Sequence, residues 1–304
     1  MQHFTHAHGR IWLAVSAVAL AIALFAPGRA AGQEEVDVRR PLAADGALYV
    51  SNMAGSLTII GWDRNEVHIT GELGRAVEKL LVSGDEEQLE VEVKIDEDRH
   101  RGAEAELELH VPAGCRIDVE SISADCELSE FSGRASFETV SGDFTARGTP
   151  ERLEATSVSG DLDVVVSTGR LELQTVSGDI SLEVEGGEVG IETVSGDCEV
   201  IGGSFASIDF SSVSGDLDLE GALSPRGSFD FETHSGELQL HLPSETSAEF
   251  TAASFSGDIE TDFATRDLHR RKQTFGQELS FSVGDGEAAV RIETFSGDVD
   301  ISAR

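Results

Sequence analysis

Residues 153–166 read LEATSVSGDLDVVV, and residues 171–184, which lie 18 positions later, read LELQTVSGDISLEV. Both stretches place Ser-Gly-Asp between two short runs in which apolar and polar residues alternate. Alternation with a period of two indicates β-strands. Ser-Gly is turn chemistry, because glycine accepts positive φ without steric cost. Each copy is therefore predicted to form two short strands joined by a tight turn.

The tripeptide recurs along most of the chain. Counted from the degenerate copy Ser123-Ala124-Asp125, successive spacings are 18, 18, 18, 18, 19, 21, 21 and 40 residues, with Ser235-Gly236-Glu237 as a close variant. The last spacing is about twice the period, which indicates one repeat that has lost its signature. The predicted structural turn motif consists of Ser141, Gly142, Ser159, Gly160, Ser177, Gly178, Ser195, Gly196, Ser214, Gly215, Ser256, Gly257, Ser296 and Gly297.

Alignment of the copies places apolar residues in shared columns, such as Leu153, Leu171 and Val189 six positions before the serine. A strand pair with such columns buries its apolar side only by stacking on its neighbours. The predicted fold is therefore all-β: a single-stranded parallel β-helix, or β-solenoid, with about 18–21 residues per coil and roughly ten coils. This prediction requires the three column residues to lie directly over one another.

The N-terminus has a different composition. Arg10, the apolar run 11–26 and the small residues around Ala30 have the layout of a signal peptide, so we expect export to the periplasm, the cell surface or the exterior. A retained anchor is the alternative. The predicted organisation is a signal peptide at 1–32, divergent coils and strands at 33–116, and regular repeats at 117–304. An insertion at 262–287 is expected to form a hairpin turning at Gly284-Asp285-Gly286.

The charge balance excludes some partners. Without residues 1–32 the chain keeps 20 basic and 57 acidic residues, a formal charge of −37. Such a surface repels nucleic acid and anionic lipid, so neither is an expected partner, and the mature chain has no predicted membrane span. A final coil ending at Arg304 shows no evident cap, which leaves end-to-end self-association open unless residues 262–287 fold over the coil edge.

The repeated acidic position is the sharpest candidate site. It forms a column that includes Asp143, Asp161, Asp179, Asp197 and Asp216. Stacked carboxylates are suitable ligands for calcium, so a calcium-stabilised β-roll is one alternative. The simpler interpretation is that each Asp or Ser caps its own turn. We expect no cofactor.

Catalytic residues are not predicted. A catalytic serine is not needed in many copies, and no histidine recurs beside it. His234 and His241 share one coil and are expected to be polar surface residues. A polysaccharide-active β-helix enzyme remains the second alternative. Cys126 and Cys198 share an inward column four coils apart, too far to form a disulfide, and the state of Cys115 is left open.

The repeats also resemble a known family. Thr-Val-Ser-Gly-Asp coils behind a signal peptide are similar to a bacterial putative-adhesin family of unknown function, whose domain is a β-strand-repeat solenoid. The stretches 55–63, 111–114 and 292–299 carry the same resemblance, which covers the chain from about residue 47 onward. The resemblance implies an envelope or surface protein and carries over no catalytic residues. The predicted function is a non-catalytic, exported binding, adhesion or structural module, whose ligand is an unidentified protein or glycan.

Overall fold

The computed structural model describes residues 34–96, 103–167, 169–272 and 276–304. The predicted signal peptide therefore lies outside the described residues. Within these ranges every regular element is a β-strand, which confirms the all-β prediction. No helix in the described part reaches the length and hydropathy that a membrane crossing requires.

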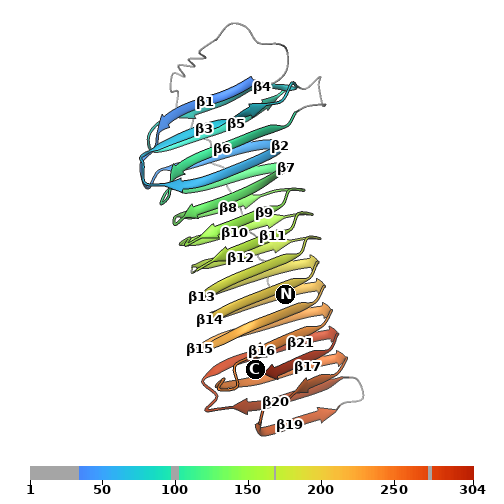
Figure 1. Ribbon diagram of the computed structural model, residues 1–304. Coiled ribbons are helices and arrows are strands. Elements are labelled where there is room, and N and C mark those ends of the chain that lie inside the picture. Colours follow the sequence, from blue (N-terminus) through green and yellow to red (C-terminus); the bar gives the residue numbers. More distant parts are fainter. Residues whose placement is uncertain (1–33, 97–102, 168, 273–275) are drawn as a thin grey trace, which may run out of the picture. The chain divides into compact units, whose positions relative to one another are not determined.

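The strands form two ladders, one on each side of the Ser-Gly-Asp turns (Figure 1). The first ladder contains strands that precede the turns and, at its two ends, strands that pair with them: β4 (Val77–Gly84), β5 (Gln88–Ile95), β8 (Arg134–Glu138), β10 (Arg152–Ser157), β12 (Arg170–Thr175), β17 (Ala248–Ser256), β19 (Arg266–Lys272), β20 (Gln277–Val283) and β21 (Ala288–Ser296). The second contains strands that follow the turns and, at the N-terminal end, strands that pair with them: β1 (Glu34–Pro41), β3 (Glu66–Leu73), β6 (Ala105–Pro112), β9 (Phe144–Gly148), β11 (Leu162–Val166), β16 (Leu238–Leu242), β18 (Ile259–Thr261) and β22 (Val299–Ala303). Five long strands belong to both: β2 (Ala47–Trp62), β7 (Arg116–Phe131), β13 (Ile180–Ser195), β14 (Cys198–Ser214) and β15 (Leu217–Ser235).

Equivalent positions of successive repeats pair in parallel and in register. Leu153 pairs with Leu171, which pairs with Val189, and all three are at most 3% exposed. On the second ladder Leu162 pairs with Ile180 and Ile180 with Cys198, again buried. The inward columns of the two ladders thus form one apolar core, as the column pattern predicts.

The repeats are not stacked in sequence order at the C-terminal end. β21 pairs in parallel with β15 on one side and with β17 on the other, and β22 lies likewise between β16 and β18. The last repeat is therefore inserted between the two repeats that precede it. The expectation of an uncapped final coil ending at Arg304 is wrong, because β22 is paired on both sides. The alternative, that residues within 262–287 cover an end of the stack, fits the pairing of β20 with β17 and of β19 with β20.

The 40-residue interval does not contain a repeat without its signature. Its strand β20 runs antiparallel to β17, and β19 runs antiparallel to β20. The Gly284–Gly286 turn, with positive φ at both glycines, is not a hairpin turn, because β20 and β21 lie on opposite sides of β17. The hairpin is instead formed by β19 and β20.

The N-terminal end is arranged in a similar way. β2 pairs in parallel with β7 on one side and with β5 and β6 on the other, so the first repeat is also inserted. Beyond it, β4 runs antiparallel to β5, β3 to β6, and β1 to β3. Antiparallel strands therefore follow the parallel ladders at both ends.

Candidate functional site

The Ser-Gly-Asp turns lie over one another and form one edge where the two ladders meet; we call it the turn edge. Its glycines are required by close packing between repeats. A Cβ on Gly178 would lie 2.1 Å from the carbonyl oxygen of Gly160, and one on Gly160 would lie 2.0 Å from that of Gly142. Neither Gly160 nor Gly178 has a φ in the left-handed region. The expected reason, positive φ, therefore applies only at later copies such as Gly215, where φ is 150°.

The serines of the motif are hydrogen-bonded to the preceding repeat. The backbone N–H of Ser159 donates to the Val140 carbonyl oxygen at 3.0 Å, and its hydroxyl donates to the same oxygen at 3.2 Å. Ser177 makes the same two bonds to Val158. These hydroxyls act as structural donors between repeats.

A second hydroxyl column supports the turn from inside. Two residues before each motif serine stands a buried Ser or Thr. The Thr175 hydroxyl oxygen accepts the Gly178 N–H at 2.9 Å, and that of Ser157 accepts the Gly160 N–H at 2.7 Å. A buried N–H that lacks a partner is costly, so these two hydroxyls stabilise their turns. Among the described residues, the equivalent hydroxyl oxygens of Thr139, Thr193, Ser212 and Thr294 have no hydrogen-bond partner, so the column does not support every turn in this way.

The aspartates form a hydrogen-bonded ladder between repeats. One carboxylate oxygen of Asp143 accepts the backbone N–H of Asp161 at 3.0 Å, and Asp161 accepts that of Asp179 at 2.9 Å. The same bond recurs from Asp125 to Asp143, Asp179 to Asp197, Asp197 to Asp216, Asp216 to Glu237, and Asp298 to Asp258. Each of these carboxylates therefore caps the next repeat. The prediction that each Asp caps its own turn is wrong for them. In the described ranges no group of three or more His, Cys, Asp or Glu has a metal-binding arrangement.

Beside these columns lies a row of exposed apolar side chains that is not among the predicted site residues. The residue just before the motif serine is apolar in eight of nine repeats and about half exposed, from 44% at Val158 and Val176 to 51% at Val213. We call this row the apolar stripe. In stacking order it consists of Ile122, Val140, Val158, Val176, Val194, Val213, His234, Phe295 and Phe255.

The signal for the stripe was present in the sequence. Alternation predicts that this position faces outward, because its neighbour two before the serine faces inward. An outward position that is apolar in almost every repeat has no role in the core. It is therefore a candidate for contact with a partner.

The stripe becomes aromatic at the C-terminal end. The rings of His234 and Phe295 are stacked with centroids 4.8 Å apart, and Phe295 stacks on Phe255 at the same distance. This stack exists because β21 is inserted between β15 and β17. A shallow depression of about 320 Å³ adjoins it, lined by Ser254, Phe255, Gln277, Glu278, Glu293 and Thr294 among others.

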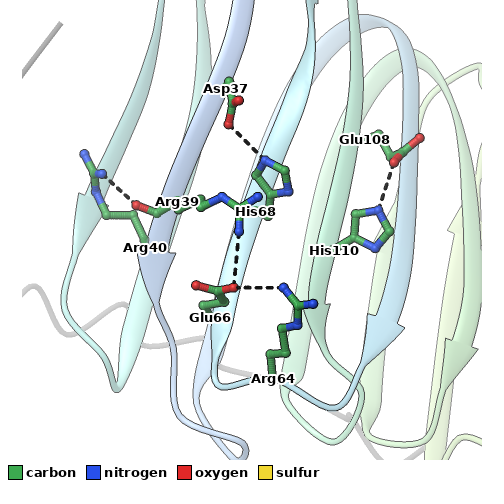
Figure 2. Close-up of polar contacts among 8 residues, drawn as sticks. All are labelled: Asp37, Arg39, Arg40, Arg64, Glu66, His68, Glu108 and His110. Carbon is green, nitrogen blue, oxygen red and sulfur yellow. Dashed lines mark hydrogen bonds and ion pairs between the residues drawn. The ribbon is translucent and has the colours of Figure 1, made fainter. Parts of the chain in front are cut away.

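A separate polar and aromatic group lies on the outer face of the N-terminal strands. Trp62 stacks on His110 at a centroid distance of 5.1 Å and on His68 at 6.4 Å, while the Arg64 guanidinium lies 4.8 Å from the Trp62 ring. The two imidazoles pair with carboxylates: His68 with Asp37 and His110 with Glu108, both at 2.9 Å (Figure 2). These contacts join β1, β2, β3 and β6 across their outer surface.

The remaining candidates are separated from one another. Cys115, Cys126 and Cys198 are buried free thiols in the core. Burial raises the pKa of Cys115 and of Cys198 to about 12, and it raises that of Cys126 as well. His234 belongs to the stripe, whereas the Nδ1 of His241 lies 2.7 Å from the Ser302 hydroxyl oxygen on the second ladder. The structure brings together the serines, glycines and aspartates of the motif, but it does not bring His234 to His241 or the three cysteines to one another.

Comparison with solved structures finds several proteins that are distantly similar to this chain. A putative adhesin from Parabacteroides distasonis is 12% identical over 88% of this chain and 97% of its own, with a TM-score of 0.43. A putative cell adhesion protein from Clostridium sporogenes is 12% identical over 89% and 100%, with a TM-score of 0.23. A putative lipid binding protein from P. distasonis is 9% identical over 89% and 97%, with a TM-score of 0.38. Similarity at this level supports no conclusion about ligands.

The sequence comparisons are consistent with one family across the chain. No curated protein sequence matches it. The family model described as Toastrack DUF4097 matches residues 36–188 and again residues 166–302, which together span both inserted ends and all the Ser-Gly-Asp repeats. The chain therefore belongs to the Toastrack DUF4097 family.

Proposed function

We propose that this protein is a non-catalytic binding module of the cell envelope or cell surface, with adhesion as its role, and that the turn edge is its binding face. The single observation that carries the proposal is the apolar stripe. Eight of the eleven exposed large hydrophobic side chains among the described residues belong to it. Contiguous exposed apolar surface on a soluble protein commonly marks an interaction site.

The ladders suit such a role. In-register pairing supports a β-solenoid of roughly ten coils, in which every repeat contributes one side chain to the stripe at the strand spacing of about 4.8 Å. A stripe of nine positions would then extend about 38 Å. A core that is continuous from repeat to repeat holds these side chains at constant spacing, which preorganises the face for a partner.

The expected location follows from the N-terminal sequence. The leader layout at 1–32 supports export, and the formal charge of −37 on the remainder supports solubility outside the cell. Cell fractionation combined with N-terminal sequencing of the mature protein tests this part. Recovery from the cytoplasm with residues 1–32 intact would contradict it.

A variant of the stripe tests the binding face. Val158→Thr, Val176→Thr and Val194→Thr together keep β-branched side chains while removing three exposed methyl groups. Ile201→Thr is the matched control, because Ile201 is 42% exposed but lies outside the stripe. We expect the triple variant to lose at least tenfold in binding of the labelled protein to intact producing cells, with the control unchanged.

Two outcomes would overturn the proposal. Equal cell binding by the triple variant, with melting temperature retained, would show that the stripe is not the binding face. Release of oligosaccharides when the protein is incubated with envelope polysaccharide would favour the polysaccharide-active enzyme instead.

A further inference from the structure

The apolar stripe is one side chain wide, and its borders are acidic. On one side lie the carboxylates two residues after the motif serine, all of them exposed: Asp125, Asp143, Asp161, Asp179, Asp197, Asp216, Glu237, Asp298 and Asp258. On the other side, three residues before the serine, lie exposed Glu120, Glu138, Glu192, Glu232 and Glu293, interspersed with Thr156, Gln174, Ser211 and Ala253. Neither border contains a basic residue.

This arrangement disfavours a second copy of the chain as the occupant. Two stripes facing each other would bring four acidic borders together. Like charges about 5 Å apart repel by about 1 kcal/mol even in water, and the repulsion rises as water is excluded. An anionic membrane surface is disfavoured for the same reason. The favoured partner has an apolar row with positive charge on both sides of it.

An amphipathic helix can present such a surface. Residues at i, i+3, i+4 and i+7 form a narrow apolar row, and the positions that flank it on either side can be Lys or Arg. The row advances by 5.4 Å per helical turn, close to the strand spacing of about 4.8 Å between repeats. Lys and Arg side chains are also long enough to reach carboxylates on either side while their stems cover apolar surface.

We propose that the occupant of the turn edge is a cationic amphipathic helix of another protein, laid along the stripe with Lys and Arg side chains against the two acidic borders. This inference rests on the proposed function and adds the chemistry of the partner. The aromatic stack of His234, Phe295 and Phe255 would hold the most apolar end of the helix, since aromatic side chains dominate the energetics of interfaces.

A synthetic peptide tests the proposal directly. The probe is an 18-residue peptide with Leu in the apolar row and Lys at all flanking positions. The controls are the same peptide with Glu in place of Lys, and a scrambled peptide of the probe's own composition. Binding is measured by fluorescence anisotropy with the full mature chain. We expect the Lys peptide to bind, and the Glu and scrambled peptides to bind at least tenfold more weakly.

Protein variants separate the contribution of the apolar stripe to peptide binding from that of the acidic borders. The stripe variant Val158→Thr/Val176→Thr/Val194→Thr is expected to weaken peptide binding at least tenfold, whereas Ile201→Thr is expected to leave it unchanged. The border variant Glu138→Gln/Glu192→Gln/Glu232→Gln is expected to bind more weakly at low salt and to lose part of the salt dependence, because exposed charges are screened by salt. Circular dichroism confirms that each variant is folded.

Several results would overturn the proposal. These are equal binding of the Glu peptide, equal binding of the scrambled peptide, or unchanged affinity in the folded stripe variant. If no peptide binds but the stripe variant still loses cell binding, the proposed function stands and the partner chemistry is wrong. A dimer in sedimentation that the stripe variant abolishes would identify a second copy as the occupant and would likewise overturn the helix.

Discussion

At the scale of single residues, the glycines of the turn edge show how stacking limits side-chain size. The carbonyl oxygen of the previous repeat occupies the space that a Cβ would need at Gly142, Gly160, Gly178 and Gly196, with distances of 2.0–2.2 Å. Ala124 occupies the equivalent place in the first degenerate copy, where the neighbouring repeat is β2. Glycine is thus required wherever one motif repeat lies on another.

Gly178→Ala is therefore expected to destabilise the protein by about 1–3 kcal/mol, because the backbone must shift to accommodate the methyl group. Gly190→Ala is the matched control: its Cβ would have no neighbour nearer than 3.8 Å, and its strand position favours alanine by about 0.5–1 kcal/mol. Urea unfolding measures both. A Gly178→Ala chain as stable as the parent would refute the steric account.

The three buried thiols lead to a prediction about alkaline pH. In the unfolded chain they ionise near the ordinary pKa of 9.0, whereas in the folded chain burial raises the pKa of Cys115 and Cys198 to about 12. Between these two pKa values the folded state binds more protons than the unfolded state. The contribution of the thiols to the free energy of unfolding is therefore fully present below pH 9, and it is lost as the pH rises above 9. The expected slope is about 1.4 kcal/mol per pH unit for each thiol.

Chemical denaturation at pH 8, 9, 10 and 11 measures this slope. The matched variant is Cys115→Ala/Cys126→Ala/Cys198→Ala. Its free energy of unfolding is expected to be lower than that of the parent at pH 8 but to fall less steeply with pH above pH 9. A parent chain with no steeper alkaline loss than this variant would contradict the prediction. In the native state at pH 8 the parent thiols should also react with iodoacetamide only as fast as the chain unfolds.

At the scale of elements, the aspartate ladder links each turn to the next. Asp179 illustrates the balance, because one carboxylate oxygen accepts the Asp197 N–H at 2.9 Å while its charge lies close to other carboxylates. Asp179→Asn keeps an acceptor oxygen and removes a charge, so we expect stability within about 0.5 kcal/mol of the parent or slightly above it at low salt. Asp179→Ala loses the bond, at a cost of about 1 kcal/mol.

Thermal melting of the two variants at low and high salt separates the contribution of the carboxylate charge from that of the hydrogen bond. The Asn variant should differ from the parent mainly at low salt, whereas the deficit of the Ala variant should persist at high salt. If both variants lose the same stability at every salt concentration, the carboxylate charge itself is needed, and the hydrogen-bond account fails.

Calcium tests the alternative role of the same column. Because one oxygen of each ladder carboxylate already accepts an amide N–H, we expect millimolar calcium to shift the melting temperature no more than magnesium at equal ionic strength. A calcium-specific rise of several degrees that Asp161→Asn/Asp179→Asn/Asp197→Asn abolishes would favour the calcium-stabilised β-roll.

At the scale of the whole described chain, the inserted last repeat is expected to stabilise the strands on both sides of it. β17 has described partners only in β20 and β21, and β18 only in β22. Deletion of residues 288–304 should therefore remove amide hydrogen-exchange protection from β17 and β18 as well as exposing β15 and β16. If the repeats wound in sequence order, the same deletion would remove only a terminal repeat, and β17 would keep its protection.

The sequence by itself determined the repeat, the inward columns and the turn edge. Period-two alternation around each Ser-Gly-Asp identifies which side chains are buried, and Leu153, Leu171 and Val189 do stack as the spacing requires. The residue before each serine was equally visible, and its outward direction follows from the same alternation. These features are local, so a pattern along the chain is enough to predict them.

Only the tertiary structure decided the order in which the repeats stack and which residues pair between neighbouring repeats. Because all repeats carry the same columns, the column pattern allows Phe231 to lie beside Ala252 as readily as beside Ile292; the fold selects Ile292. That choice depends on β20, which occupies the other side of β17. The glycine contacts and the aspartate ladder join residues that are at least 18 positions apart, so they exist only once the repeats are stacked.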